Sequence, residues 1–107
     1  MLFRSFRRER IVEQLGVLFG DGTYPTFHQH TARGIRRSAL HETWKSAGAH
    51  FAVSAGWEFV EWFRPASAPE QPVPWTWKRD FWSPWVAQEH RVIREGVGAL
   101  DMSLMSK

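Results

Sequence analysis

The feature that most restricts how this chain can fold is a proline-rich stretch past its middle. Residues 65–74 read Pro-Ala-Ser-Ala-Pro-Glu-Gln-Pro-Val-Pro, with four prolines in ten residues. Proline lacks the backbone N–H that a helix interior and a central strand both require, so neither structure can run through this stretch. We therefore predict a linker over 65–74, with regular structure confined to the residues on either side.

Two helices and two strands are predicted before the linker. An apolar stripe at spacings of four and three predicts a helix over 5–19, which glycines end at residues 20 and 22. Ser38 is a candidate cap for a second helix over 39–47, whose Leu40 and Trp44 would be buried. Alternating bulky residues predict strands over 50–54 and 58–64, joined by a turn at Ala55-Gly56.

One helix and one strand are predicted after the linker. Ser83-Pro84 is typical of a helix start, so a helix is expected over 84–96, with an apolar stripe at Val86, His90, Ile93 and Val97. Residues 99–105 alternate like a strand with Leu100, Met102 and Leu104 on one face. The expected fold class is α+β. An apolar strand this near the last residue has no later element to pair with, which favours a piece of something longer.

Size and composition exclude several classes of protein. At 107 residues the chain has room for one small domain and cannot hold a complete flavoenzyme. It has no cysteine, which excludes a disulfide scaffold and a thiolate zinc site and fits a reducing compartment. No apolar run is long enough to span a membrane, and the arginine-rich start lacks the apolar region of a secretory signal. We expect a cytoplasmic chain.

A metal site is the first functional hypothesis that the residues raise. His28 and His30 stand two apart, so on an extended segment both imidazoles would share a face. A zinc site needs further ligands, for which His41, Glu42 and His50 are the candidates. No metalloprotease-type motif is present, and hydrogen-bonded loop histidines are the favoured interpretation.

Evidence for catalysis within the chain is absent from the sequence. Glu89 and His90 are adjacent, but neighbouring residues on a helix point about 100° apart and do not converge. His90 falls on the apolar stripe, so we predict a core histidine. Nucleophile elbows, phosphate-binding loops and dinucleotide fingerprints are all missing. No catalytic residue and no metal ligand is assigned.

A tryptophan-rich stretch supplies the alternative hypothesis. Residues 75–85 carry four tryptophans, with Lys78 and Arg79 between them. Bases stack on indoles while basic side chains follow the phosphates, so this stretch could form a platform for single-stranded nucleic acid in a small interaction module. Packing of the indoles into the core competes with that interpretation, and a net charge of only +3 argues against nucleic acid. If the indoles point inward, no platform remains.

Several motifs occur in an order that matches one known family. They include RIVEQLGVLF over 10–19, TARGIRRSALHE over 31–42, Gly48-Ala49, AGWE over 55–58, Trp62-Phe63, Phe81-Trp82, Glu89-His90-Arg91 with Arg94, and VGALDMS over 97–103. Together they cover most of the chain, which resembles the dimethylglycine/sarcosine dehydrogenase family. These are flavoproteins whose C-terminal part is similar to the glycine-cleavage T-protein, a tetrahydrofolate-dependent aminomethyltransferase.

The resemblance implies a location within a larger enzyme. Residues 1–64 would be the central connecting segment after the flavin domain, and 75–107 would be the truncated opening of the folate-binding domain. FAD and tetrahydrofolate would serve the parent enzyme, while this fragment would hold neither cofactor by itself. Met105 matches the methionine that ends the T-protein's Asp-x-Ser-x-Met pattern, which makes it the one expected cofactor-binding residue.

The same resemblance implies a reaction and a set of partners. The parent would oxidise a small methylated amine with flavin and pass the released carbon to tetrahydrofolate. The fragment would supply walls and scaffold and would show no turnover alone. Its expected partners are the remainder of the parent enzyme or a second copy of the chain, and no membrane.

Overall fold

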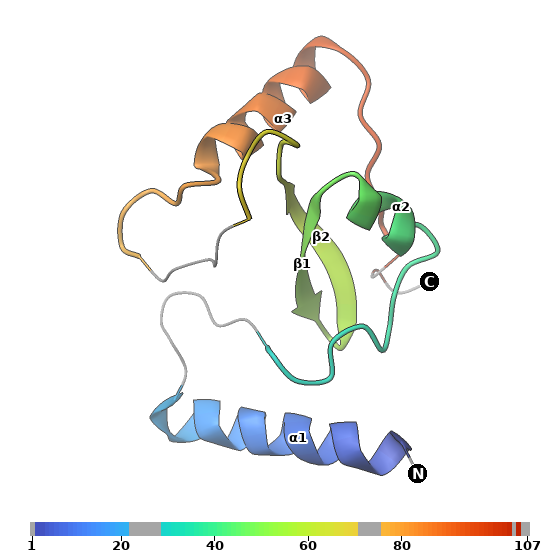
Figure 1. Ribbon diagram of the computed structural model, residues 1–107, viewed down its shortest axis with the longest axis vertical. Coiled ribbons are helices and arrows are strands. Elements are labelled where there is room, and N and C mark those ends of the chain that lie inside the picture. The colour runs from blue at the N-terminus through green and yellow to red at the C-terminus, as the bar shows by residue number, and fades with distance from the viewer. Residues whose placement is uncertain (1, 22–28, 71–75, 104, 106–107) are drawn as a thin grey trace.

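The computed structural model describes residues 2–21, 29–70, 76–103 and 105. The element order is α1 (Leu2–Gly16), a π-helical turn (Val17–Asp21), α2 (His41–Ser46), β1 (Ala49–Ser54), β2 (Trp57–Phe63) and α3 (Ser83–Glu95). Figure 1 shows the β1–β2 hairpin in the middle, with α2 beside it, α3 above it and α1 at the opposite end. Three helices and one antiparallel pair confirm the predicted α+β class.

The hairpin is the centre of the fold. Its two-residue turn places Ala55 at φ 49° and Gly56 at φ 82°, as a primed turn requires, and this matches the predicted turn. His50 pairs with Trp62 and Phe51 pairs with Val60, so one extra β2 residue is bulged out between the two pairs. A bulge of this kind increases the local twist of the strands. Both strands lie within one residue of their predicted bounds.

The core gathers around one indole on β2. Trp62 and Ala52 are the buried apolar residues of the described chain. Trp82 stacks on Trp62 with ring centroids 6.2 Å apart, and Trp85 lies tilted at 5.4 Å. On another side the His50 ring stacks on Trp62 at 4.5 Å, almost parallel. The tryptophan-rich stretch therefore supplies packing for the hairpin, which is where large aromatic surfaces contribute most to stability.

The α3 helix is less buried than its apolar stripe predicts. It begins at Ser83 with Pro84 in its first turn, close to the expected start, yet none of its residues is buried. Trp85 and Glu89 are half-buried, whereas His90 is exposed, so the prediction of a core histidine is wrong. The physical reason is that α3 touches β2 mainly through its first two turns, and its later apolar residues lie beyond the hairpin.

The α2 helix is shorter than predicted. It starts at His41, and the Ser38 side chain does not cap it; instead the Ser38 carbonyl accepts the His41 N–H at 3.2 Å. Leu40, one of the two residues expected to be buried, is exposed, whereas Trp44 is half-buried.

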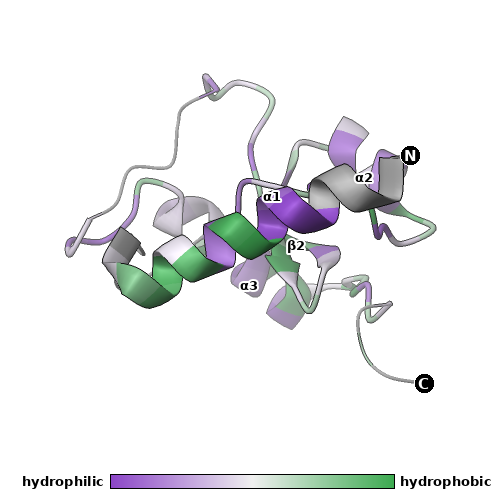
Figure 2. Cartoon of the chain, turned by 90° about the horizontal axis from the view of Figure 1, so that it is seen from below, coloured by the Kyte–Doolittle hydropathy of each residue, from purple (hydrophilic) through white to green (hydrophobic). Residues whose placement is uncertain are grey.

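The α1 helix lies apart from the hairpin in Figure 1 and ends three residues sooner than the predicted helix. A π turn follows α1, and Gly20 within that turn has a φ of 109°, which breaks the helical path. Arg10 donates to the Thr31 hydroxyl at 3.2 Å, and Glu13 accepts the His30 N–H, which ties the helix to the loop before α2. The apolar residues of α1 and of the π turn are exposed (Ile11, Val12, Leu15, Leu18 and Phe19). Figure 2 colours the later part of α1 as hydrophobic.

The predicted strand over 99–105 is wrong. Residues 99–103 and 105 carry no strand, and Leu104 lies outside the described residues. A lone extended segment leaves its N–H and C=O groups unpaired, and the described chain offers it no neighbouring strand. The segment turns instead at Asp101, whose carboxylate accepts the Ser103 N–H at 3.0 Å. Leu100 is left 81% exposed.

The structure describes the first six residues of the predicted linker. Residues 65–70 contain no helix or strand and form a turn, in which Ala68 N–H donates to the Pro65 carbonyl at 2.9 Å. Residues 71–74 lie outside the described part.

Within the described chain, no helix combines the length and the apolar character needed to cross a membrane.

Candidate functional site

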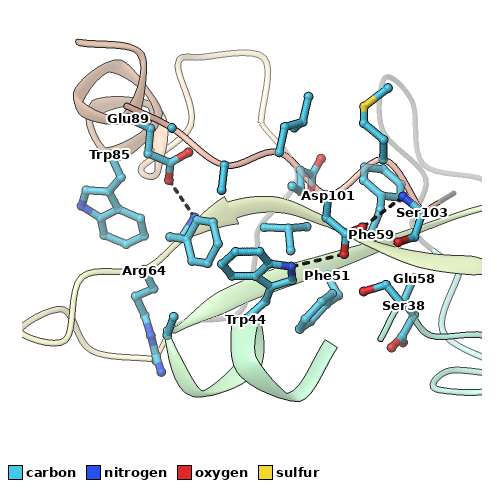
Figure 3. Close-up of a pocket in the computed structure, with 18 of the residues that line it drawn as sticks. Ser38, Trp44, Phe51, Glu58, Phe59, Arg64, Trp85, Glu89, Asp101 and Ser103 are labelled. Carbon is cyan, nitrogen blue, oxygen red and sulfur yellow. Dashed lines mark hydrogen bonds between the residues drawn. The ribbon is translucent and has the colours of Figure 1, made fainter. Parts of the chain in front are cut away.

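A groove of about 930 Å³ runs between the hairpin, α2, α3 and residues 98–103 and 105. We call it the apolar groove, because aromatic and aliphatic side chains supply most of its wall. Its aromatic residues are Trp44, Phe51, Trp57, Phe59, Phe63 and Trp85. Figure 3 shows Trp44 and Phe51 below the strands and Trp85 with Glu89 above them. A groove of this size and character suits a small organic molecule.

Asp101 binds the segment 98–103 to α2 at the edge of this groove. Its carboxylate accepts the Trp44 indole N–H at 3.2 Å and the Ser103 backbone N–H at 3.0 Å, the two bonds drawn in Figure 3. Hydrogen bonds from the side chains of Ser103 and Ser38, and then from Trp44, lower the pKa of Asp101 to about 2. A carboxylate held ionised in this way keeps the segment against α2 without a strand ladder.

Glu89 fixes α3 over the opposite end of the groove. Its carboxylate accepts the Phe63 backbone N–H at 2.9 Å, at the last residue of β2. His90 is exposed, so the two neighbouring side chains do not converge, as their helical spacing predicts. The role of Glu89 is therefore to satisfy the strand end, and it does not form an acid–base pair with His90.

A buried charged cluster joins the loop 33–37 to α2 and β2. Glu58 is 9% exposed and His41 is 6% exposed, and His41 Nε2 lies 2.7 Å from Glu58 Oε2. The other Glu58 oxygen accepts from Arg33 Nε at 2.8 Å and from the Gly34 N–H at 3.0 Å. The His41 ring also stacks on Phe51 with centroids 4.2 Å apart.

The cluster keeps Glu58 ionised despite its burial. Burial by itself raises the pKa of Glu58, but hydrogen bonds from Arg33, His41 and Gly34 outweigh it, and the net pKa lies below the ordinary value. Outside the cluster, Glu42 accepts from Arg37 at 2.9 Å and lies 3.3 Å from His41 Nδ1. The arrangement is a continuous chain of side-chain contacts from Arg33 through Glu58, His41 and Glu42 to Arg37.

The sequence predicts His41 and Glu42 only as candidate metal ligands. Its spacing gives no sign that Glu58 is the buried partner of His41. His41 and Glu58 are seventeen residues apart, a separation that carries no helix or strand periodicity. They meet because the Ala55-Gly56 turn sets the register of β2 against β1. A signal was still available, since a carboxylate in a strand of bulky aromatic residues needs a cationic partner when it is buried.

The zinc hypothesis has no support from the described residues. His28 lies outside them, and His30 contacts α1 through its backbone N–H. His41 bonds Glu58 while His50 stacks on Trp62, so the candidate ligands do not gather. Within the described ranges, no three His, Cys, Asp or Glu side chains are placed to hold a metal ion.

The nucleic-acid hypothesis loses most of its platform. Trp82 and Trp85 pack against Trp62, and Trp75 lies outside the described residues. Of the three described tryptophans in this stretch, Trp77 is 69% exposed, whereas Trp82 and Trp85 are half-buried. The core interpretation of the aromatic residues therefore accounts for the observed packing better than a stacking surface does.

Met105, the expected cofactor-binding residue, lines the apolar groove. It is 52% exposed, so a ligand in the groove could cover it. Its role stays a prediction, as does the division of the chain at residues 65–74. Contacts do cross that division, since α3 packs against β2 through Trp85 and Glu89.

Comparison with known proteins identifies the family. Residues 40–107 match the family model of the GCVT N-terminal domain. A curated relative, the 4-methylaminobutanoate oxidase (formaldehyde-forming) of Paenarthrobacter nicotinovorans, is 32% identical over 105 residues. That alignment covers 97% of this chain and 12% of the relative, so the chain spans about an eighth of the relative's length. No solved structure matches the chain significantly.

These two matches agree with the ordered motifs along the chain. The relative aligns over nearly the whole chain, including the segments before residue 40. The family model covers residues 40–107. The resemblance to the dimethylglycine/sarcosine dehydrogenase family is thereby confirmed, and the chain belongs to the GCVT N-terminal domain family.

Proposed function

We propose that this chain forms part of the tetrahydrofolate-binding region of an FAD-linked dehydrogenase or oxidase that demethylates a small secondary or tertiary amine. The observation that carries the proposal is that the family match and the apolar groove coincide. Residues 40–107 match the GCVT N-terminal domain and include every residue lining the groove except Ser38. The part of the fold that identifies the family is thus also the part that offers a ligand site.

The groove has the chemistry that a folate requires. A reduced folate presents a flat, hydrogen-bonding ring system joined to an aminobenzoyl ring, which aromatic walls accommodate. The Met105 thioether, half-exposed at the groove, would contact that ring system, and such contacts with aromatic rings are favourable. When bound, tetrahydrofolate supplies the nitrogen that accepts a one-carbon unit. The chain's own residues would wall the site and exclude water from it.

The flavin does not fit this chain. A dinucleotide site needs a glycine-rich turn between a strand and a helix so that the pyrophosphate can approach the backbone. The sequence contains no such turn. FAD would therefore be held elsewhere in the parent enzyme, as would the groups that react with the amine, and its partner would be the remainder of that enzyme. The lack of cysteine supports a cytoplasmic location.

Titration of the full chain with 5-formyltetrahydrofolate tests the proposal. Trp44, Trp57 and Trp85 line the groove, so binding should quench tryptophan fluorescence. Quenching should change little between low and high salt, because the contacts are mainly apolar. Met105→Ala should weaken binding about five-fold, the effect of losing roughly 1 kcal/mol of apolar contact from a half-covered side chain.

Val97→Ala is the matched control. Val97 is 95% exposed and lies outside the groove lining, so its truncation should leave the affinity unchanged. Equal weakening by both variants, or no saturable quenching at all, would contradict the proposal. The purified chain should also show no amine-dependent dye reduction when flavin is supplied, and measurable turnover would overturn its assignment as scaffold.

A further inference from the structure

A second groove, of about 530 Å³, lies between the loop 33–37, the end of α2 and residues 64–70. We call it the basic groove. Four of its lining residues are cations (Arg33, Arg37, Lys45 and Arg64) and two are carboxylates (Glu58 and Glu70). With both of its histidines neutral, the lining has a formal charge of +2, and Glu42, which pairs with Arg37 from outside the lining, lowers the local charge to +1. Four cationic side chains therefore meet at one hollow of the surface.

Two of these cations are fixed by bonds within the protein. Arg33 donates to Glu58 at 2.8 Å and to the Phe51 carbonyl at 2.7 Å. Arg37 donates to the Gly34 carbonyl at 2.7 Å and to Glu42 at 2.9 Å. These bonds hold both guanidinium groups at the wall, so a ligand would not have to order them.

The other two cations retain donors for a ligand. Within the described part of the chain, Lys45 forms no ion pair, and the partner of Arg64 is Glu70 at 3.9 Å. The Glu70 side chain is 91% exposed, so this pair is weak and an arriving anion can displace it. Figure 3 shows the Arg64 side chain pointing away from Trp85 and Glu89 of the apolar groove.

The floor of the basic groove is aromatic. His41 covers Phe51 and His50 covers the buried Trp62 by stacking, so the half-buried rings of His50 and Phe81 are the ones that a ligand can reach. The volume exceeds what a lone oxyanion fills and suits a small molecule with a flat body. Basic groups around an aromatic floor select a ligand that is anionic at one end and planar at the other.

We propose that the basic groove binds the dianionic phosphate of a small monoester with a planar body. A phosphate monoester carries nearly two negative charges at neutral pH, so the four cations attract it more strongly than a carboxylate, which carries one. The fork of an arginine and the point charge of a lysine both suit phosphate oxygens. The basic groove shares Phe51, Glu58 and Arg64 with the lining of the apolar groove, but this proposal does not depend on folate binding.

Calorimetric titration of the full chain at fixed ionic strength tests the proposal with three probes. Phenyl phosphate should bind most tightly, inorganic phosphate several-fold more weakly because it lacks the ring, and benzoate most weakly because it has one charge. Lys45→Gln and Arg64→Gln should each weaken phenyl phosphate binding about ten-fold, as the loss of one charge-assisted hydrogen bond implies.

Arg91→Gln and Arg94→Gln are matched controls, since both residues are exposed on α3 and lie outside the groove. They remove the same charge and should change the affinity less than two-fold. Equal losses in groove and control variants would overturn the site in favour of general charge attraction. Stronger competition by a thymidine oligonucleotide than by phenyl phosphate would overturn the small-ligand assignment and favour a single strand instead.

A second measurement covers the case in which a groove variant fails to fold. Phenyl phosphate should shift the ring signals of His41 and His50 in the NMR spectrum of the unmodified chain, because both rings line the groove. An equal concentration of benzoate should shift them much less. Unchanged ring signals at saturating phenyl phosphate would overturn the proposal.

Discussion

Replacing Glu58 tests the buried cluster that joins β2 to α2 and the loop 33–37. In Glu58→Ala, His41 loses its 2.7 Å partner, and the Arg33 guanidinium and the Gly34 N–H lose their acceptor. Removing one member of a buried ion pair costs about 3–5 kcal/mol, because the other charge stays desolvated. Arg33 is 35% exposed and recovers part of that cost from water, so we expect a loss of about 2–4 kcal/mol.

A loss of this size is easy to measure in a small domain. A domain this small is stable by about 5–15 kcal/mol, so the urea midpoint followed by tryptophan fluorescence should fall markedly. Glu58→Gln should lose less than Glu58→Ala, since the amide oxygen can still accept from Arg33 and Gly34. Glu61→Ala is the control on the same strand: its carboxylate lies 3.9 Å from His50 and is 30% exposed, so we expect less than about 1 kcal/mol.

The cluster also predicts a pH dependence of stability. The pKa of Glu58 is lower in the folded chain than its ordinary value of 4.5, so the folded state binds fewer protons than the unfolded state near that pH. Its contribution to the free energy of unfolding is complete above pH 4.5 and is lost as the pH falls through the folded pKa. Glu58→Gln should flatten the acid limb. A loss below about 1 kcal/mol for Glu58→Ala, with an unchanged acid limb, would refute the reasoning.

Four further substitutions test separate features of the fold. Gly48→Ala should cost about 3 kcal/mol in urea unfolding, because φ is +88° and the new Cβ would lie 2.6 Å from the Arg64 carbonyl oxygen. Gly56→Ala, at φ +82°, would place its Cβ no closer than 3.9 Å to the Arg36 side chain, so it should cost only about 1 kcal/mol, and equal costs would contradict the clash. Ala55→Asn should raise stability by about 0.5–1 kcal/mol, since asparagine tolerates the left-handed φ of 49°; a lower midpoint would contradict this. The ionised Asp101 contributes stability that is complete above pH 3.8 and is lost as the pH falls toward 2, so Asp101→Asn should remove it. An acid-unfolding curve that is unchanged in this variant would contradict the bond to α2.

Local signals in the sequence predicted the parts of the fold that depend on neighbouring residues. The turn at Ala55-Gly56 follows from one glycine between two alternating stretches, and the start of α3 follows from Ser83-Pro84. The linker residues that the structure describes, 65–70, have neither helix nor strand, as their prolines predict. Each of these outcomes is decided within a few residues, where backbone constraints are strong.

The failures concern features that need a distant partner. Residues 99–103 alternate like a strand, but alternation predicts only which face would be buried and not whether another strand is available. The α3 stripe that includes His90 has helical periodicity, but the hairpin is too short to cover its later turns. The bond between His41 and Glu58 depends on the strand register and leaves no trace in the spacing. The ordered motifs identified the family because their evidence is spread over most of the chain.

The central claim is that the apolar groove is part of a folate site that includes Met105. The chain has three methionines, so its spectrum with ¹³C-labelled methionine methyl groups is simple to follow during a titration with 5-formyltetrahydrofolate. We predict a saturable shift of the Met105 methyl signal, assigned by its loss in Met105→Ala, with a smaller shift at Met102, which also lines the groove. Methionine signals that stay unchanged at saturating ligand would contradict the claim.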